Sequence, residues 1–211
     1  MKIYKKIKDR LKFQLLKQRN NKSEKIFGLG LSKTGTTSFS SALNLLGYKS
    51  IHTPPIINLK NGEINFQWPW WLSTYDAMAD LPVPYYYKYF DEEYPNAKFV
   101  LTIRNEEDWL RSCKKHFDED LQLLLKRPEP HFKPLITLCE KMYGSSRYEE
   151  QSFRDAYQKH NAEVIEYFEG RDNFLVIDIC AGDSWEKLCP FLGIAVPTVQ
   201  FPHGNATKIN K

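Results

Sequence analysis

The chain has 211 residues, of which 42% are hydrophobic and 14% aromatic, so it can bury a substantial core and is not disordered throughout. Its 30 Lys and Arg exceed its 26 Asp and Glu, giving a formal net charge of +4. No run of about 18 apolar residues is present, and the charged N-terminus lacks the apolar segment of a secretory signal. We therefore expect no transmembrane helix, a cytoplasmic location, and one folded domain over residues 25–211.

Residues 1–24 are expected to form a basic arm or helix that differs from the rest of the chain. Residues 1–25 hold ten Lys and Arg against two acidic residues, a net charge of +8, so the remaining residues carry −4. Ile3, Ile7 and Leu11 have the spacing of an apolar stripe on a basic helix. Two interpretations stay open, a solvated arm and a weak, peripheral contact with a membrane surface. No nucleic-acid partner is expected, because the aromatic residues are not interleaved with basic ones.

The four cysteines have none of the spacings that are typical of metal sites. We expect all four to be buried free thiols in a reducing compartment. They are Cys113, Cys139, Cys180 and Cys189. No metal site is predicted, and the oligomeric state is left open.

Apolar runs alternate with segments of helical periodicity, which predicts a three-layer α/β fold with a mainly parallel central sheet flanked by helices. The run before Arg104 (KFVLTI) is continuous and rich in β-branched residues, as in a central strand buried on both faces. Strands are expected over 25–31, 48–52, 75–80, 97–104 and 174–179. Helices are expected over 36–46, over 85–94, after a cap at Asn105, from a capping box of Ser146 and Glu149 to Phe168, and over 184–192.

Two stretches interrupt the alternation and are expected to be irregular. Residues 54–74 contain Pro54-Pro55, Asn61-Gly62 and a Trp-Pro-Trp-Trp run, and residues 127–134 contain three prolines. Insertions near strand ends of a parallel sheet often shape a substrate pocket. The alternative for the tryptophans is ordinary packing of the insertion on the core.

The segment 30–38 (GLSKTGTTS) joins the first expected strand to the first expected helix. Backbone N–H groups and the positive end of a helix dipole converge on an anion in such a loop. The spacing G-x4-G-x-T resembles a Walker A loop, but Thr36 stands where the Walker lysine belongs, and the lysine is Lys33. A lysine inside the loop suits a group near a 5′-phosphate better than the β- and γ-phosphates of a triphosphate.

A second set of residues follows the strand expected over 97–104. Arg104 ends this strand, and Ser112 lies eight residues later, about two turns into the next helix. A guanidinium at the carboxyl end of a parallel strand faces the ligand crevice and can bind a phosphate through two hydrogen bonds. The alternative is an ion pair of Arg104 with one of the acidic residues 106–108.

Both segments resemble the sulfotransferase family that uses 3′-phosphoadenosine-5′-phosphosulfate (PAPS). The run S-K-T-G-T-T-S is similar to the loop that binds the 5′-phosphosulfate in this family. The run A-K-F-V-L-T-I-R-N-E-E-D-W-L-R-S is similar to the element whose Arg and Ser hold the 3′-phosphate, although Glu106 replaces a common proline. The tail from Trp185 to Asn205 resembles a branch of small family members, so the resemblance extends from about residue 25 to residue 205.

The resemblance implies a P-loop-like fold, PAPS as donor, 3′,5′-adenosine bisphosphate (PAP) as product, and no metal. It implies transfer to a hydroxyl or amine of a small molecule, glycan or glycolipid, with residues 68–71 and 85–90 as candidate acceptor lining. Lys33 is expected to stabilise the charge on the leaving phosphate. The residues implied in donor binding are Ser32, Lys33, Thr34, Gly35, Thr36, Thr37, Ser38, Arg104 and Ser112.

An alcohol acceptor requires a general base, which is a His or a Glu in many family members. In the cytosolic branch a His precedes Leu-Pro, and this chain has Asp80 before Leu81-Pro82. Asp80 is the first candidate base, although an Asp with a pKa of about 4 is a weak base unless burial raises its pKa. The alternative for Asp80 is a cap of the turn, and His52 is the second candidate base.

Two other functions stay open. A P-loop kinase of a nucleoside or metabolite is disfavoured by the missing Walker lysine and by the lack of a clear Walker B aspartate after an apolar run. A non-catalytic nucleotide-binding protein of the same fold would explain an Asp where a His or Glu is expected.

Overall fold

The computed structural model describes residues 24–120 and 133–204, so the expected basic arm lies outside the described residues. Its centre is a five-stranded sheet in the order β2-β5-β1-β6-β7, in which every pairing is parallel. The strands are β1 (Ile26–Gly28), β2 (Ser50–His52), β5 (Ala77–Ala79), β6 (Lys98–Thr102) and β7 (Phe174–Ile177). Each lies within one of the five expected ranges, so the predicted parallel α/β fold is confirmed.

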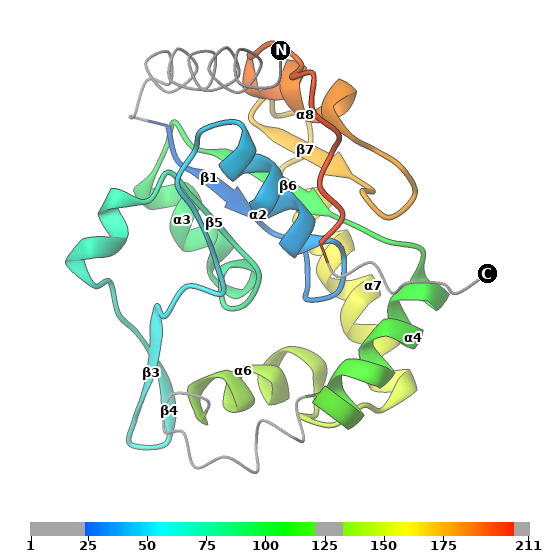
Figure 1. The fold of residues 1–211 in the computed structure, drawn as a ribbon. Helices are drawn as coiled ribbons and strands as arrows, with labels where there is room; N and C mark the ends of the chain where they lie inside the picture. Colours follow the sequence, from blue (N-terminus) through cyan, green and yellow to red (C-terminus); the bar gives the residue numbers. More distant parts are fainter. Residues whose placement is uncertain (1–23, 121–132, 205–211) are drawn as a thin grey trace, which may run out of the picture.

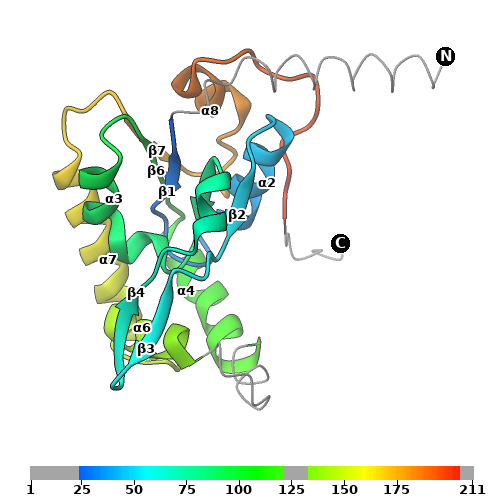
Figure 2. The ribbon, with the colours of Figure 1, turned by 90° about the vertical axis from the view of Figure 1, so that its left-hand side faces the viewer.

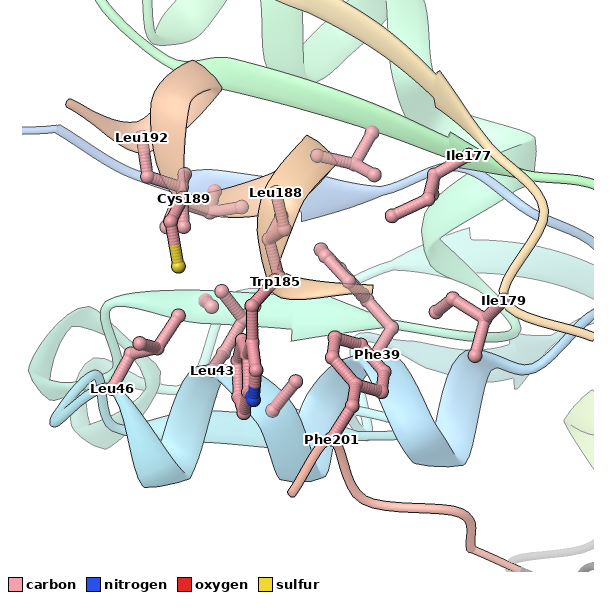
Figure 3. Packing of buried hydrophobic residues seen from close by; sticks show 14 of the residues in the cluster. Phe39, Leu43, Leu46, Ile177, Ile179, Trp185, Leu188, Cys189, Leu192 and Phe201 are labelled. Carbon is pink, nitrogen blue, oxygen red and sulfur yellow. The ribbon is translucent and has the colours of Figure 1, made fainter. Parts of the chain in front are cut away.

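Helices cover both faces of this sheet, as Figures 1 and 2 show. On one face, α2 (Thr36–Leu45) and α8 (Trp185–Leu192) pack over Ile26 and Val100. Figure 3 shows Phe39 and Leu43 of α2 against Trp185 and Leu188 of α8. On the other face, α3 (Tyr87–Glu93) and α7 (Glu150–Tyr167) pack over Phe27 and Phe99. Successive residues of β1 thus enter different cores, as strand geometry requires.

A third core lies beyond the carboxyl ends of the strands. It joins α4 (Glu106–Lys115) and α6 (Lys133–Tyr143) to α7 through Trp109, Leu138 and Phe153. Leu31 and Leu81, which follow β1 and β5, belong to the same cluster. The loops at this edge of the sheet therefore rest on a packed base.

The region 54–74 is more regular than its composition predicts. It contains an antiparallel hairpin of β3 (Ile57–Lys60) and β4 (Glu63–Phe66), followed by the 3-10 helix η1 (Trp70–Thr74). Asn61 (φ 54°) and Gly62 (φ 80°) form the two-residue turn that an Asn-Gly pair favours. The expectation of an irregular insertion was wrong because this turn signal joins two strands of only four residues each.

Three further expectations change at the residue level. Residues 121–132 lie outside the described residues, and α6 begins at Lys133, within the stretch expected to be irregular. The capping box was wrong, because α7 begins at Glu150 without a side-chain cap and Ser146 Oγ donates to Glu140. Cys180 is exposed, whereas the other three cysteines are buried free thiols as predicted.

The remaining elements are the 3-10 helix η2 (Val83–Tyr86) and the π-helical turn η3 (His116–Asp120). Within residues 24–120 and 133–204, no helix has the length and apolar character needed to cross a membrane.

The cap of α4 is directly testable. Asn105 Oδ1 accepts a hydrogen bond from the Asp108 amide at 3.2 Å. We expect Asn105→Ala to lower the free energy of unfolding by about 1 kcal/mol, because one amide of the first helical turn loses its acceptor. Asn105→Asp, which keeps an acceptor at the cap, should retain most of the stability. Urea unfolding measures both, and equal losses in the two variants would contradict the cap.

Candidate active site

The loop between β1 and α2 is held by close contacts with β6 and α4. A Cβ on Gly30 would lie 1.8 Å from Thr102 Oγ1, so only glycine fits there. Thr34 Oγ1 donates to the Leu31 carbonyl at 2.7 Å and lies 2.7 Å from Thr102 Oγ1. From α4, Trp109 Nε1 donates to the Ser32 carbonyl at 2.9 Å. These contacts therefore fix the loop at Gly30, at Ser32 and at Thr34.

The end of the loop presents the N-terminus of α2. Gly35 (φ 94°) is the N-cap residue and provides no side-chain cap. Lys33 also has a positive φ, of 76°, which is unusual for a residue with a side chain. Uncapped amides and the helix dipole make such an end an anion-binding site. The predicted loop thus has the conformation that its proposed chemistry requires.

Several hydroxyl groups of the loop are already engaged. Ser32 Oγ and Thr36 Oγ1 donate to Asp80, and the Thr34 hydroxyl bonds within the loop. Ser38 Oγ accepts the Gly204 amide at 2.9 Å, which leaves its own hydrogen free to be donated. Thr37 Oγ1 makes a longer contact, of 3.4 Å, with His52 Nε2. The groups that remain for an anion are the amides at the start of α2, the hydroxyl groups of Thr37 and Ser38, and the nearby cations.

Arg104 faces the loop instead of the acidic residues that follow it. Its Nη1 donates to the Lys33 carbonyl at 3.3 Å. Its Nε is buried and has no hydrogen-bond partner among the described residues. The alternative of an ion pair with residues 106–108 was wrong, because Glu106 and Glu107 bind Arg154 and Asp108 binds Arg111. A buried guanidinium N–H without a partner, beside an anion loop, fits a phosphate or sulfate oxygen.

Ser112 lies half-buried on α4, two turns after Arg104. Its neighbour Cys113 is buried, and burial raises the pKa of the Cys113 thiol while the charges of Lys33 and Arg104 act to lower it. The two cations are thus within electrostatic reach of this part of α4. The place of Ser112 in the site stays a prediction.

Asp80 and His52, the two candidate bases, form one pair. Asp80 follows β5 and His52 ends β2, and His52 Nε2 lies 2.9 Å from Asp80 Oδ2. Asp80 Oδ1 also accepts from Ser32 Oγ at 2.5 Å and from the Leu81 amide at 2.7 Å. The expected cap of the turn is therefore present as well.

The electrostatics of the pair separate the two candidates. Burial acts to raise the pKa of the Asp80 carboxyl. The hydrogen bonds from His52, Ser32 and the Leu81 amide, together with the charge of His52, outweigh burial and hold the pKa below its ordinary value. Asp80 therefore stays ionised, and its pKa is not raised toward that of an effective base. His52 keeps 32% of its side chain exposed, with Nδ1 3.2 Å from Thr53 Oγ1.

Backbone strain concentrates at the same place. Four non-glycine residues of the described chain have positive φ, and three of them are Lys33, Thr53 and Asp80. Each follows the carboxyl end of a neighbouring parallel strand. Conformations of this kind persist where the surroundings fix them and are concentrated at functional sites.

The sequence did not single out several residues that support the site. Trp109 holds the Ser32 carbonyl, and Tyr157 Oη bonds both the amide and the carbonyl of Arg104. The Tyr143 hydroxyl is fully buried near Ser32, and burial holds its pKa above the ordinary value while Ser32 acts to lower it. The ring of Tyr157 is buried in the third core, and its helical position does not by itself predict the hydrogen bonds of its hydroxyl.

The aromatic residues expected to line an acceptor pocket divide into two groups. Trp68 and Trp71 pack on the core beneath α3, and Trp70 is 80% exposed. Ile57 and Ile64 of the hairpin pack on the cluster that contains Leu31 and Leu81, and Tyr86 packs on both clusters. The hairpin and η2 thus border the loop. Within the described ranges, no three His, Cys, Asp or Glu residues are grouped so that they could hold a metal ion.

Comparisons with known proteins bear on the family and the fold. A family model described as "Sulfotransferase domain" matches residues 25–209. A protein of Aspergillus versicolor named "Ava biosynthesis cluster protein M" is 26% identical over 210 residues, which cover 85% of this chain and 80% of that protein. The crystal structure of a sulfotransferase from Alicyclobacillus acidocaldarius has a TM-score of 0.53 at 18% identity, with 83% of each chain covered. This last likeness is one of fold.

The charge of Asp80 predicts a pH-dependent stability. Because the folded protein lowers the Asp80 pKa below 3.8, the ionised carboxylate contributes stability above about pH 4 that is lost as the pH falls through the folded pKa. We expect Asp80→Asn to lower the free energy of unfolding at pH 7 by roughly 1–3 kcal/mol, and the difference from wild type to shrink below about pH 4.

Thermal unfolding between pH 3 and pH 8 measures this effect, at about 2–4 °C per kcal/mol for a chain of this size. Asp172→Asn, at an exposed aspartate, is the matched control and should unfold like wild type. A difference for Asp80→Asn that stays constant down to pH 3 would contradict a stabilising charge.

Proposed function

The chain belongs to the sulfotransferase family of enzymes, and on that premise we propose that it transfers a sulfuryl group from PAPS to a hydroxyl or amine of a small molecule, glycan or glycolipid. The observation that carries the proposal is the Arg104 guanidinium beside the loop, with its buried and unpartnered Nε. A bisphosphorylated nucleotide needs two anion sites, and a loop alone supplies one. The name of the relative from a biosynthesis cluster favours a small molecule among the three acceptor classes.

The donor site is proposed as two phosphate subsites. The amides at the start of α2, with Thr37 and Ser38, would hold the 5′-phosphosulfate at the helix N-terminus. Arg104, together with Ser112, would hold the 3′-phosphate. The hydrogen bond from Arg104 to the Lys33 carbonyl supports this arrangement, because it holds the Arg104 guanidinium beside the loop that would form the first subsite.

Lys33 would stabilise the leaving group. PAPS supplies a sulfuryl group whose bond to the 5′-phosphate oxygen breaks as the acceptor oxygen or nitrogen bonds to sulfur. Lys33, half-buried in the loop with its backbone fixed at positive φ, would neutralise the charge left on that phosphate. Positioning and charge stabilisation supply most of the catalysis in transfers of this type.

His52 would be the general base and Asp80 its positioning residue. Asp80 Oδ2 accepts from Nε2 of His52, so Nδ1 is the nitrogen that would take up the proton of the acceptor, once the Thr53 hydroxyl, 3.2 Å away, turns from it. When that proton arrives, the buried Asp80 carboxylate stabilises the imidazolium. Of the two candidate bases, His52 is favoured because the Asp80 carboxylate is occupied by four hydrogen bonds.

One observation favours a second candidate, a P-loop kinase. Asp80 follows β5, the strand beside β1, and accepts from Thr36 Oγ1 at 3.1 Å. A Walker B aspartate also follows a strand beside the loop, but the Walker A hydroxyl that binds Mg²⁺ corresponds to Thr37 and not to Thr36. Nucleotide preference separates the two functions, because a kinase has no use for a 3′-phosphate subsite.

Donor binding tests the function. We expect PAP to bind without Mg²⁺ and more tightly than ATP-Mg, and we expect Arg104→Ala to weaken PAP binding about tenfold or more, since a charge-assisted pair is lost. Arg111→Ala, at an exposed arginine on α4, is the matched control and should bind like wild type. Isothermal titration calorimetry measures all three proteins, and a preference for ATP-Mg would favour the kinase.

Sulfate transfer to an acceptor library tests the base. We expect His52→Gln to lower kcat about 10²- to 10⁴-fold while PAP affinity changes little, because glutamine can hydrogen-bond but cannot take up the proton. Asp80→Asn should lower kcat less, since it disturbs the orientation and charge of the base and leaves the base itself. A His52→Gln enzyme with wild-type kcat would remove His52 from the mechanism.

A further inference from the structure

The C-terminal part of the described chain, residues 196–204, runs back along α2 to the phosphate loop, and we refer to it as the strap (Figures 1 and 2). Two contacts anchor it to the core. Trp185 Nε1 donates to the Val199 carbonyl at 2.7 Å. Phe201 is only 6% exposed, and its ring lies 4.6 Å from that of Trp185, above Phe39 and Leu43 of α2 (Figure 3).

The strap meets the first turn of α2 at Gly204. The Gly204 amide donates to Ser38 Oγ at 2.9 Å. A Cβ on residue 204 would lie 2.9 Å from Thr37 Cγ2, and Gly204 has no positive φ. The glycine is therefore required by the close approach of two chain segments, and not by the backbone conformation.

This contact acts on two residues of the proposed donor site. Ser38 Oγ accepts from Gly204, so the side chain is oriented and its hydrogen is left to donate toward an anion at the start of α2. The strap also passes so close to Thr37 that a Cβ on residue 204 would lie 2.9 Å from its methyl carbon. The phosphate subsite is thus fixed from outside the loop as well as from within it.

We propose that the strap is a positioning element of the donor site, and that docking of Gly204 on Thr37 and Ser38 strengthens donor binding. This inference rests on the proposed function, because it assumes that the anion at the start of α2 belongs to the donor. Coupling between two events is reciprocal, so donor binding should in turn hold the strap on α2.

Variants at the contact test the proposal with PAP as the probe. Gly204→Ala places a methyl group against Thr37 Cγ2 and should push the strap away, so we expect the Kd for PAP to rise about three- to tenfold, the effect of one lost hydrogen bond. Thr37→Ser removes the obstructing methyl group and keeps the hydroxyl. The double variant Thr37→Ser/Gly204→Ala should therefore bind PAP within about twofold of Thr37→Ser alone.

A second measurement needs no ligand. Hydrogen exchange of the peptide 36–45 should be faster in ligand-free Gly204→Ala than in wild type, and PAP should slow exchange in the strap of the wild type. Val199→Ala is the matched control, because the Val199 side chain is exposed and only its carbonyl makes the contact with Trp185. It should leave both PAP affinity and exchange unchanged.

The outcomes separate the two ideas. If wild type fails to bind PAP, the proposed function is wrong, and the role of the strap in donor binding fails with it. If wild type binds PAP and Gly204→Ala binds equally well, only the role of the strap is overturned. A weakened Gly204→Ala variant that Thr37→Ser does not rescue would also overturn it, because the loss would then not come from the contact with Thr37.

Discussion

The buried carboxylate of Asp80 is the interaction on which the site depends. It accepts hydrogen bonds from the loop through Ser32, from α2 through Thr36, and from β2 through His52. An ionised carboxylate is costly to bury unless donors replace its water shell, and here four donors do so. One charge therefore sets both the shape of the phosphate loop and the orientation of the imidazole, so the donor side and the acceptor side of the proposed reaction share a support.

Strand register explains why residues far apart in sequence meet at this carboxylate. Gly28 is paired with Ala79 of β5, and His52 of β2 is paired with the same Ala79. One residue further along, Asp80 thus lies between the start of the loop and the end of β2. On the other side, Gly28 is paired with Val100, so the loop at Gly30 passes Thr102, at the end of β6. Parallel strands of equal register deliver all their ends to one edge.

This strand arrangement explains which features of the fold and the site could be predicted from the sequence and which could not. The apolar runs predicted all five parallel strands, and the loop and Arg104 were identified from residue chemistry at strand ends. His52 and Asp80 were weighed as competing bases, because a sequence does not contain the strand order that makes β2 and β5 neighbours. The hairpin was missed although its Asn-Gly turn is a local signal, because its strands have only four residues each and pack on the third core through Ile57 and Ile64. The start of α6 was missed because the helix is held by packing on the same core.

The two halves of the site differ in how they are built, and burial gives the reason. On the proposed donor side, a Cβ on Gly30 would overlap Thr102, and the side chains of Thr34 and Thr102 are fully buried. Larger side chains do not fit at these positions. On the other side, the hairpin and η2 contribute Ile57, Ile64 and Tyr86 to the third core while much of their remaining surface is exposed. Because both sides rest on that core through Leu31 and Leu81, the proposed acceptor side can vary in its exposed residues while its position relative to Lys33 and His52 is kept. A fixed loop with a variable border would suit the proposed transfer from one donor to different acceptors.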